Sequence, residues 1–125
     1  MSKKIINSPD APPAVGPYSH SVLAGNIQFI SGQLGIDPAT GKLKATVEEQ
    51  TEQALVNLGS ILKEAGMDYS NIVKTTVFLQ DMSDFPLANE IYTKYFPTNP
   101  PARSCVAVKT LPLGGLYEIE AIAVK

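Results

Sequence analysis

The sequence predicts an α+β domain: a mixed β-sheet with two helices packed on one of its faces. Two observations favour this class. Short β-branched runs separated by turn residues indicate strands, and apolar residues recur at helical spacing in two longer stretches between them. A third observation concerns assembly. Several predicted strands are apolar on both faces, and two helices cover only one of these faces, so the other face needs a partner and we expect an oligomer.

The composition is that of a soluble globular protein. Hydrophobic residues make up 44% and charged residues 18% of the 125 residues, so we expect a single domain spanning residues 1–125. The net charge of -2 and the scattered Lys and Arg argue against a nucleic-acid partner. The sequence has no apolar run long enough for a membrane span and no secretory signal, so we expect a cytoplasmic protein. Because Cys105 and His20 are the only residues of their kinds, cofactor-independent chemistry is expected.

The first part of the chain combines a short strand with a proline-rich arm. Residues 3–6 predict an edge strand, and residues 8–19 contain four prolines, which are incompatible with a helix interior or a central strand. The arm carries Gly16-Pro17-Tyr18. Its stiff backbone lowers the entropic cost of presenting the Tyr18 phenol to a ligand, although a simple entry arm explains the pattern equally well.

A hairpin is predicted next. Residues 21–24 and 27–31 flank the turn dipeptide Gly25-Asn26. The second strand ends near Gly32, where the missing side chain lets another backbone or a ligand come close. Residues 37–42 have turn chemistry without periodicity, and they predict a plain surface loop.

The first helix is predicted from about Val47 to Ala65. Thr46 and Glu49 match a capping box, and Gly66 stands where a left-handed residue ends a helix. The apolar residues between these ends recur at helical spacing on one face, which we expect to pack on the sheet.

A central strand and a second helix are predicted to follow. Residues 72–80 carry β-branched side chains on both faces, which favours a central strand. Residues 81–84 supply capping groups for a helix over residues 85–95. On spacing alone, Asn89 lies off the apolar stripe of this helix and is better explained as facing solvent.

The last two predicted strands carry charges among apolar residues. Arg103 opens the run 103–108, and Glu118 and Glu120 lie within the run 116–124. If the two strands pair as an antiparallel hairpin across the turn-rich connection between them, a guanidinium and a carboxylate share one site. A structural ion pair between Arg103 and Glu118 explains the pattern at least as well.

These residue types also suggest a chemistry. Arg103 and Cys105 are two positions apart in a strand and therefore share a face, where the guanidinium fork matches a carboxylate. Glu118, or Glu120 on the same face, is a candidate general acid or base for a water molecule. A catalytic thiol needs a base and the chain offers only His20, so a buried structural Cys105 is favoured.

Several motifs follow one another along the chain: Gly16-Pro17-Tyr18, Ser31-Gly32-Gln33, the segment 76–85 followed by Asn89 and Tyr92, and the segment 101–104 followed by Leu111-Pro112 and by 118–120. In their order and over nearly the whole chain, these motifs resemble those of the RidA family of reactive intermediate deaminases, also called the YjgF family. The resemblance implies a chorismate-mutase-like subunit in a homotrimer, with sheets lining a central barrel and active sites in the clefts between subunits.

The resemblance also implies an activity. RidA proteins hydrolyse 2-imino acids, which are in equilibrium with enamines such as 2-aminoacrylate and 2-aminocrotonate, to 2-keto acids and ammonia without a cofactor. Carried over by matching positions, Arg103 binds the substrate carboxylate and Glu118 positions and activates the attacking water. Four further positions line the pocket or hold the reacting end: Tyr18 and Asn89 through their side chains, and Gly32 and Cys105 through backbone groups.

Other functions remain open at this point. A non-catalytic trimer that binds small 2-keto acids or amino-acid intermediates and regulates a partner would use Arg103 equally well, and turnover separates it from an enzyme. An RNA-directed activity has also been attached to this family, but it conflicts with the acidic pI of about 5.3. Chorismate mutase is suggested by fold alone, which is weak support for a function.

Overall fold

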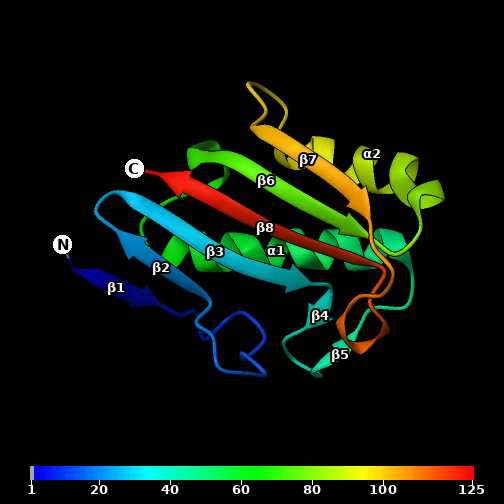
Figure 1. The fold of residues 1–125 in the computed structure, drawn as a ribbon, viewed down its shortest axis with the longest axis horizontal. Coiled ribbons are helices and arrows are strands. Elements are labelled where there is room, and N and C mark those ends of the chain that lie inside the picture. The colour runs from blue at the N-terminus through cyan, green and yellow to red at the C-terminus, as the bar shows by residue number, and fades with distance from the viewer. Residues whose placement is uncertain (1) are drawn as a thin grey trace.

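A six-stranded mixed sheet with two helices behind it forms the architecture of residues 2–125, the part of the chain that the computed structural model describes (Figure 1). All neighbouring strands pair antiparallel except β6 and β7, which are parallel. The predicted α+β class is confirmed. In their order across the sheet, the strands are β1 (Lys3–Ile6), β2 (Ser21–Ala24), β3 (Ile27–Leu34), β8 (Tyr117–Val124), β6 (Ile72–Leu79) and β7 (Ala102–Ala107).

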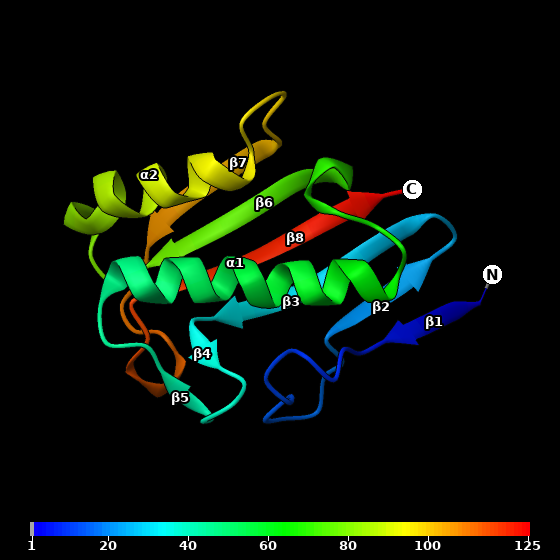
Figure 2. The ribbon, with the colours of Figure 1, turned by 180° about the vertical axis from the view of Figure 1, so that it is seen from behind.

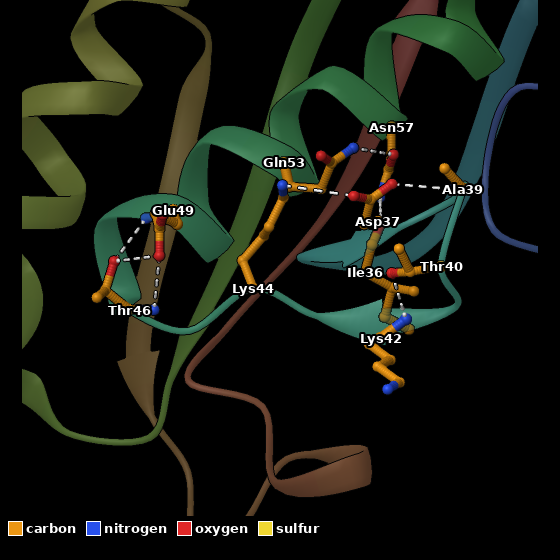
Figure 3. Close-up of polar contacts among 10 residues, drawn as sticks. All are labelled: Ile36, Asp37, Ala39, Thr40, Lys42, Lys44, Thr46, Glu49, Gln53 and Asn57. Atoms are coloured by element: carbon orange, nitrogen blue, oxygen red, sulfur yellow. Dashed lines mark hydrogen bonds and ion pairs between the residues drawn. The ribbon is translucent and has the colours of Figure 1, made fainter.

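Both helices lie on the same face of the sheet, as Figure 2 shows, and their predicted positions are confirmed. Helix α1 (Val47–Glu64) begins with the predicted capping box, in which Thr46 and Glu49 exchange hydrogen bonds (Figure 3). Gly66, with φ of 72°, follows its last turn. Helix α2 (Phe85–Tyr95) comes after a short 3₁₀ turn. The apolar side of α1 is completely buried through Leu55, Leu58, Ile61 and Leu62.

The segment predicted as a plain surface loop is the tip of a two-stranded ribbon. Strands β4 (Ile36–Asp37) and β5 (Lys42–Leu43) pair antiparallel, and Lys44 forms an ion pair with Asp37 across 3.4 Å (Figure 3). The buried amide of Asn57 on α1 donates to the Ile36 carbonyl at 2.9 Å and holds the ribbon against the helix. Residues 38–41 form the exposed turn that was predicted, but the strands on either side were not, because two-residue strands are too short to show an alternating pattern.

The strands that carry Arg103 and Glu118 are not neighbours, so the predicted antiparallel hairpin is wrong. Strand β6 lies between them and pairs in parallel with β7 and antiparallel with β8. The reason is that β6, α2 and β7 form a β-α-β unit, whose helical crossover returns the chain parallel to its first strand. The connection after β7, with a 3₁₀ turn at Pro112–Gly114, then takes the chain across to the centre of the sheet.

The sheet face without helices exposes apolar side chains. Ile5, Phe29 and Val106 are each between 45% and 47% exposed. Ile5 and Phe29 both lie opposite Val22 in the register, so this part of the exposed surface is continuous across β1, β2 and β3. An uncovered apolar face of this kind was the basis for expecting an oligomer. Among residues 2–125, no helix is both long and apolar enough to cross a membrane.

Candidate functional site

The strand register places Arg103 and Glu118 on opposite faces of the sheet. Arg103 on β7 lies beside Thr75 on β6, and Thr75 lies beside Ala121 on β8. Thr75 and Ala121 are buried against the helices, so Arg103 shares the helix face. Glu118 is three residues before Ala121 on a regular strand and therefore points to the open face. Within one chain, the guanidinium and the carboxylate are separated by the sheet.

The guanidinium of Arg103 is held from the direction of helix α2. Its Nη1 donates to the Asn89 amide oxygen at 2.9 Å, and its centre lies 4.7 Å from the Tyr92 ring centroid and 5.4 Å from that of Phe85. Stacking on aromatic rings fixes the plane of the group without using its N–H donors. No carboxylate among residues 2–125 forms an ion pair with Arg103. The solvent-facing position expected for Asn89 from spacing alone is therefore wrong.

Cys105 lines the same small cavity as Arg103 and Asn89, on the helix face. Burial raises the pKa of its thiol, and the nearby guanidinium of Arg103 only partly opposes this effect. A thiol with a raised pKa stays protonated near neutral pH and is a poor nucleophile. This electrostatic setting agrees with a structural thiol at position 105.

A larger cavity of about 440 Å³ lies on the opposite side of the molecule and holds Glu118. Its polar part is formed by Ser31, Gly32, Gln33, Glu118 and Glu120. Its apolar wall comes from the proline-rich arm, β3, β4 and the 3₁₀ turn: Pro12, Pro13, Val15, Tyr18, Leu34, Ile36, Pro112 and Leu113.

Glu118 is a half-buried carboxyl with an altered acidity. Burial raises its pKa above the ordinary value, and the like charge of Glu120 raises it further. The missing side chain of Gly32 leaves room for this carboxyl, because a Cβ at position 32 would lie 2.8 Å from Glu118 Oε2. A side chain at position 32 would therefore force the flexible end of Glu118 to move away from β3.

Replacing Gly32 with Ala is expected to slow any reaction in which Glu118 moves a proton by roughly 100-fold, while the fold is kept. The reason is that the added methyl group displaces the flexible carboxylate of Glu118 by about 1 Å. Turnover and the unfolding midpoint of Gly32→Ala report the two effects separately. The control is the double variant Gly32→Ala with Glu118→Gln, which should be no slower than Glu118→Gln alone. If the losses multiply instead, Gly32 acts independently of Glu118.

Tyr18 reaches the Glu118 cavity from an arm that His20 holds in place. The Tyr18 side chain is 47% exposed, whereas His20 is buried. The His20 Nδ1 accepts a hydrogen bond from the Ser8 amide at 3.1 Å, and its Nε2 lies 2.7 Å from the Pro12 carbonyl. These two contacts require a neutral ring with its proton on Nε2. His20, immediately before β2, thus holds the first part of the proline-rich arm through Ser8 and Pro12.

The structure gathers the sequence-predicted residues into two groups. Asn89, Arg103 and Cys105 line the cavity on the helix face, whereas Tyr18, Gly32 and Glu118 line the cavity near the open face. Sequence analysis gave no role to Tyr117, a buried residue of the first group. Its position immediately before Glu118 on an alternating strand is the signal that places it on the helix face. Among residues 2–125, no His, Cys, Asp or Glu cluster of three could hold a metal ion.

Chemically, the two groups are complementary. The guanidinium can bind a carboxylate or another planar anion, and it has no anionic partner of its own in the described chain. The carboxyl with a raised pKa is a stronger base than an ordinary carboxylate and can take a proton from a water molecule. A small anionic substrate that needs a water molecule would use both groups.

Comparison with known proteins finds close relatives over the whole chain. The family described as Endoribonuclease L-PSP matches residues 8–125. The 2-iminobutanoate/2-iminopropanoate deaminase of Bos taurus is 52% identical over 126 residues, which cover 100% of this chain and 92% of the relative. The chloroplastic Reactive Intermediate Deaminase A of Arabidopsis thaliana is also 52% identical; the match covers 98% of this chain and 66% of that protein.

Solved structures agree with these sequence matches. The crystal structure of TdcF from E. coli with bound serine superimposes with a TM-score of 0.94 at 42% sequence identity, and the match covers 98% of each chain. The fold is therefore shared with its relatives from end to end. On the family match and on identities near 50% across full-length relatives, the chain belongs to the RidA/YjgF/L-PSP family.

Proposed function

We propose that this protein is a cofactor-independent deaminase that hydrolyses 2-imino acids, and the enamines in equilibrium with them, to 2-keto acids and ammonia. The observation that carries the proposal is the complementary pair of groups: a stacked guanidinium without an anionic partner and a half-buried carboxyl with a raised pKa. The relatives at about 50% identity, named 2-iminobutanoate/2-iminopropanoate deaminases, give it independent support.

A complete site in this proposal needs two copies of the chain. Arg103 and Glu118 point to opposite faces of one sheet, so the Arg103 side of one copy must meet the Glu118 side of another. We expect the homotrimer of the RidA family, with a chorismate-mutase-like subunit and sheets that line a central barrel. The exposed apolar side chains of the open face, such as Phe29, support this packing. Sedimentation should then give about 40 kDa, three times the 13.4 kDa chain.

The proposed reaction begins when Arg103 binds the carboxylate of the 2-imino acid. Glu118 removes a proton from a water molecule as the water oxygen attacks the carbon of the protonated imine, which gives a neutral tetrahedral carbinolamine. Glu118 then returns this proton to the nitrogen, and as the C–N bond breaks the carbinolamine hydroxyl gives its proton to Glu118, so ammonia leaves and a 2-keto acid remains. Because imines already hydrolyse in water, a positioned acid–base group, worth about 10²- to 10⁴-fold, is sufficient.

The remaining candidate residues have supporting roles in this proposal. Asn89 orients the guanidinium through the hydrogen bond at 2.9 Å. Tyr18 closes the pocket from the proline-rich arm. Backbone groups at Gly32 and Cys105 hold the reacting end of the substrate, and the single thiol suits a reducing compartment such as the cytoplasm.

A small anionic substrate is favoured over RNA, although the family description refers to ribonuclease activity. The chain has a net charge of -2, and its ten Lys and Arg form no basic stripe that could neutralise a phosphate backbone. Near the proposed site, Glu118 and Glu120 make one cavity acidic, which opposes a polyanion.

A dehydratase-coupled assay tests the proposal. A serine or threonine dehydratase generates the enamine, and release of the 2-keto acid is followed with and without this protein. The expected result is faster release in proportion to the amount of protein added, with the Glu118→Gln variant as the matched inactive control. If wild-type protein binds 2-ketobutyrate but leaves the release rate unchanged, it is a non-catalytic binder instead.

The dependence of turnover on pH should report the coupling between the two glutamates. Glu118 acts as a base only when ionised, so turnover should fall as the pH drops through its raised pKa. Glu120→Gln removes a like charge that raises this pKa, so the acid limb of the kcat/KM profile should move to lower pH. Glu120→Asp keeps the charge and should leave the limb near its wild-type position. A limb that stays fixed in Glu120→Gln would assign it to another group.

A further inference from the structure

Tyr117 is the largest fully buried side chain of the described chain, and the proposed reaction leaves its position unexplained. It is 1% exposed, and no polar atom of the described chain lies within hydrogen-bonding distance of its hydroxyl. Leaving a buried hydroxyl unpaired costs about 1–3 kcal/mol, and buried polar groups in native proteins are nearly always paired. Tyr117 therefore needs a partner that is not part of the chain.

The surroundings of Tyr117 indicate where this partner lies. Tyr117 lines the same cavity on the helix face as Arg103, Asn89 and Cys105. Burial raises the pKa of the phenol strongly, and the further charges that influence this pKa belong to Tyr92, Cys105 and Arg103. The hydroxyl end of the side chain thus faces the polar groups of the cavity, and it remains a neutral donor at any physiological pH.

The size of the cavity limits what it can hold. Its volume is about 10 Å³, which matches roughly one water molecule and is too small for an imino acid. A buried water needs two to four polar partners, and residues that line the cavity carry enough of them. They include the N–H groups of Arg103, the hydroxyl of Tyr117 and the sulfur of Cys105, beside the Asn89 amide that already accepts from Arg103. The Tyr92 hydroxyl already shares a hydrogen bond with Thr75 Oγ1 at 2.8 Å, so the water does not depend on it as a further partner.

We propose that Tyr117 and Arg103 hold one ordered water molecule between them, and that this water fixes the guanidinium in the orientation that binds a carboxylate. The water accepts hydrogen bonds from a guanidinium N–H and from the phenol O–H, and it donates to the Cys105 sulfur. Asn89 holds the guanidinium from the helix side, and the water holds it from the floor of the cavity. Tyr117 is thereby a positioning residue, and this role rests on the proposed function.

The Tyr117→Phe variant tests the water bridge, because it removes only the hydroxyl. Loss of one neutral hydrogen bond should raise the dissociation constant for 2-ketobutyrate, and the KM for imino acids, by about 2- to 10-fold. The kcat should stay unchanged, since the bound carboxylate is held equally in the ground state and the transition state. A crystal structure should contain a water within hydrogen-bonding distance of both Tyr117 Oη and an Arg103 nitrogen.

The control is Tyr69→Phe, which removes a phenol hydroxyl that donates to the Leu55 carbonyl away from both cavities. It should lower stability without changing the affinity for 2-ketobutyrate. Wild-type affinity in Tyr117→Phe, or a crystal structure without that water, overturns the water bridge. Arg103→Ala separates this result from failure of the proposed function: if that variant also binds 2-ketobutyrate normally, the carboxylate site itself is wrongly assigned.

Discussion

Arg103→Ala is expected to lower kcat/KM for 2-imino acids by about 100- to 10,000-fold. A bidentate clamp on the substrate carboxylate makes two charge-assisted hydrogen bonds, and each contributes about 1.5–3 kcal/mol. Because each factor of ten in rate corresponds to about 1.4 kcal/mol, losing both bonds gives this range. Steady-state kinetics in the dehydratase-coupled assay measure the effect.

The fold and the assembly of Arg103→Ala should stay intact. The side chain is only partly buried and forms no ion pair within the described chain, so its removal leaves no unpaired buried charge. Arg103→Lys is the informative companion, because it keeps the charge but loses the planar fork, and it should recover only part of the activity. Wild-type kcat/KM in Arg103→Ala would contradict the clamp outright.

Mixing two inactive variants should restore activity. Arg103→Ala copies keep Glu118, and Glu118→Gln copies keep Arg103, so a site formed between one copy of each contains both groups. In an equal mixture that assembles at random as a cyclic oligomer, roughly a quarter of the sites should be complete. Co-expression or co-refolding of the two variants, followed by the coupled assay, measures the recovered fraction.

The control for this experiment replaces the Glu118→Gln copy with a chain that carries both substitutions. No copy then has an intact Arg103, and the mixture should stay as inactive as its parents. If the original mixture also stays inactive although mass spectrometry finds mixed oligomers, each site is contained in one chain, against the separation that the strand register indicates.

Local patterns predicted most of the elements. Helix α1 was predicted within one residue of its observed end, because the capping box at Thr46 and the left-handed Gly66 are signals contained in a few neighbouring residues. The same holds for helix α2 and for strand β6, whose alternation of β-branched residues spans eight positions. Where the physical cause of an element is local, the sequence was sufficient.

The pairing of the strands was not predictable in the same way. Strand order depends on contacts between residues far apart in the chain. The residue patterns of β7 and β8 are compatible with pairing to each other or with pairing to β6, so they do not decide the order. One signal was available, since the succession strand, helix, strand over residues 72–107 favours a parallel β-α-β unit. Using this succession would have paired β7 in parallel with β6, although the pairing of β8 on the other side of β6 has no such local signal.

For the site, too, the sequence indicated which residue types could take part but not where the fold places them. The residue types alone suggested Arg103 as a possible carboxylate clamp and Glu118 or Glu120 as a possible acid or base, with a structural ion pair between Arg103 and Glu118 as the alternative. The resemblance to the RidA family assigned the carboxylate to Arg103 and the water to Glu118. Their separation onto two faces follows only from the register, and the contact between Arg103 and Asn89 follows from the way α2 packs over β7. The close approach of the Glu118 carboxylate to Gly32 likewise depends on the pairing of β3 with β8.

The proposed site between two copies, with Arg103 and Glu118 on opposite faces of each sheet, predicts that catalysis depends on protein concentration. If the site exists only between copies, a newly synthesised chain is inert until it finds its partners, and specific activity must collapse on dilution below the dissociation constant of the oligomer. Progress curves started from dilute, dissociated protein should then show a lag that shortens as concentration rises. Within one chain the sheet separates Arg103 from Glu118, and only association of two chains would bring the two groups into one site.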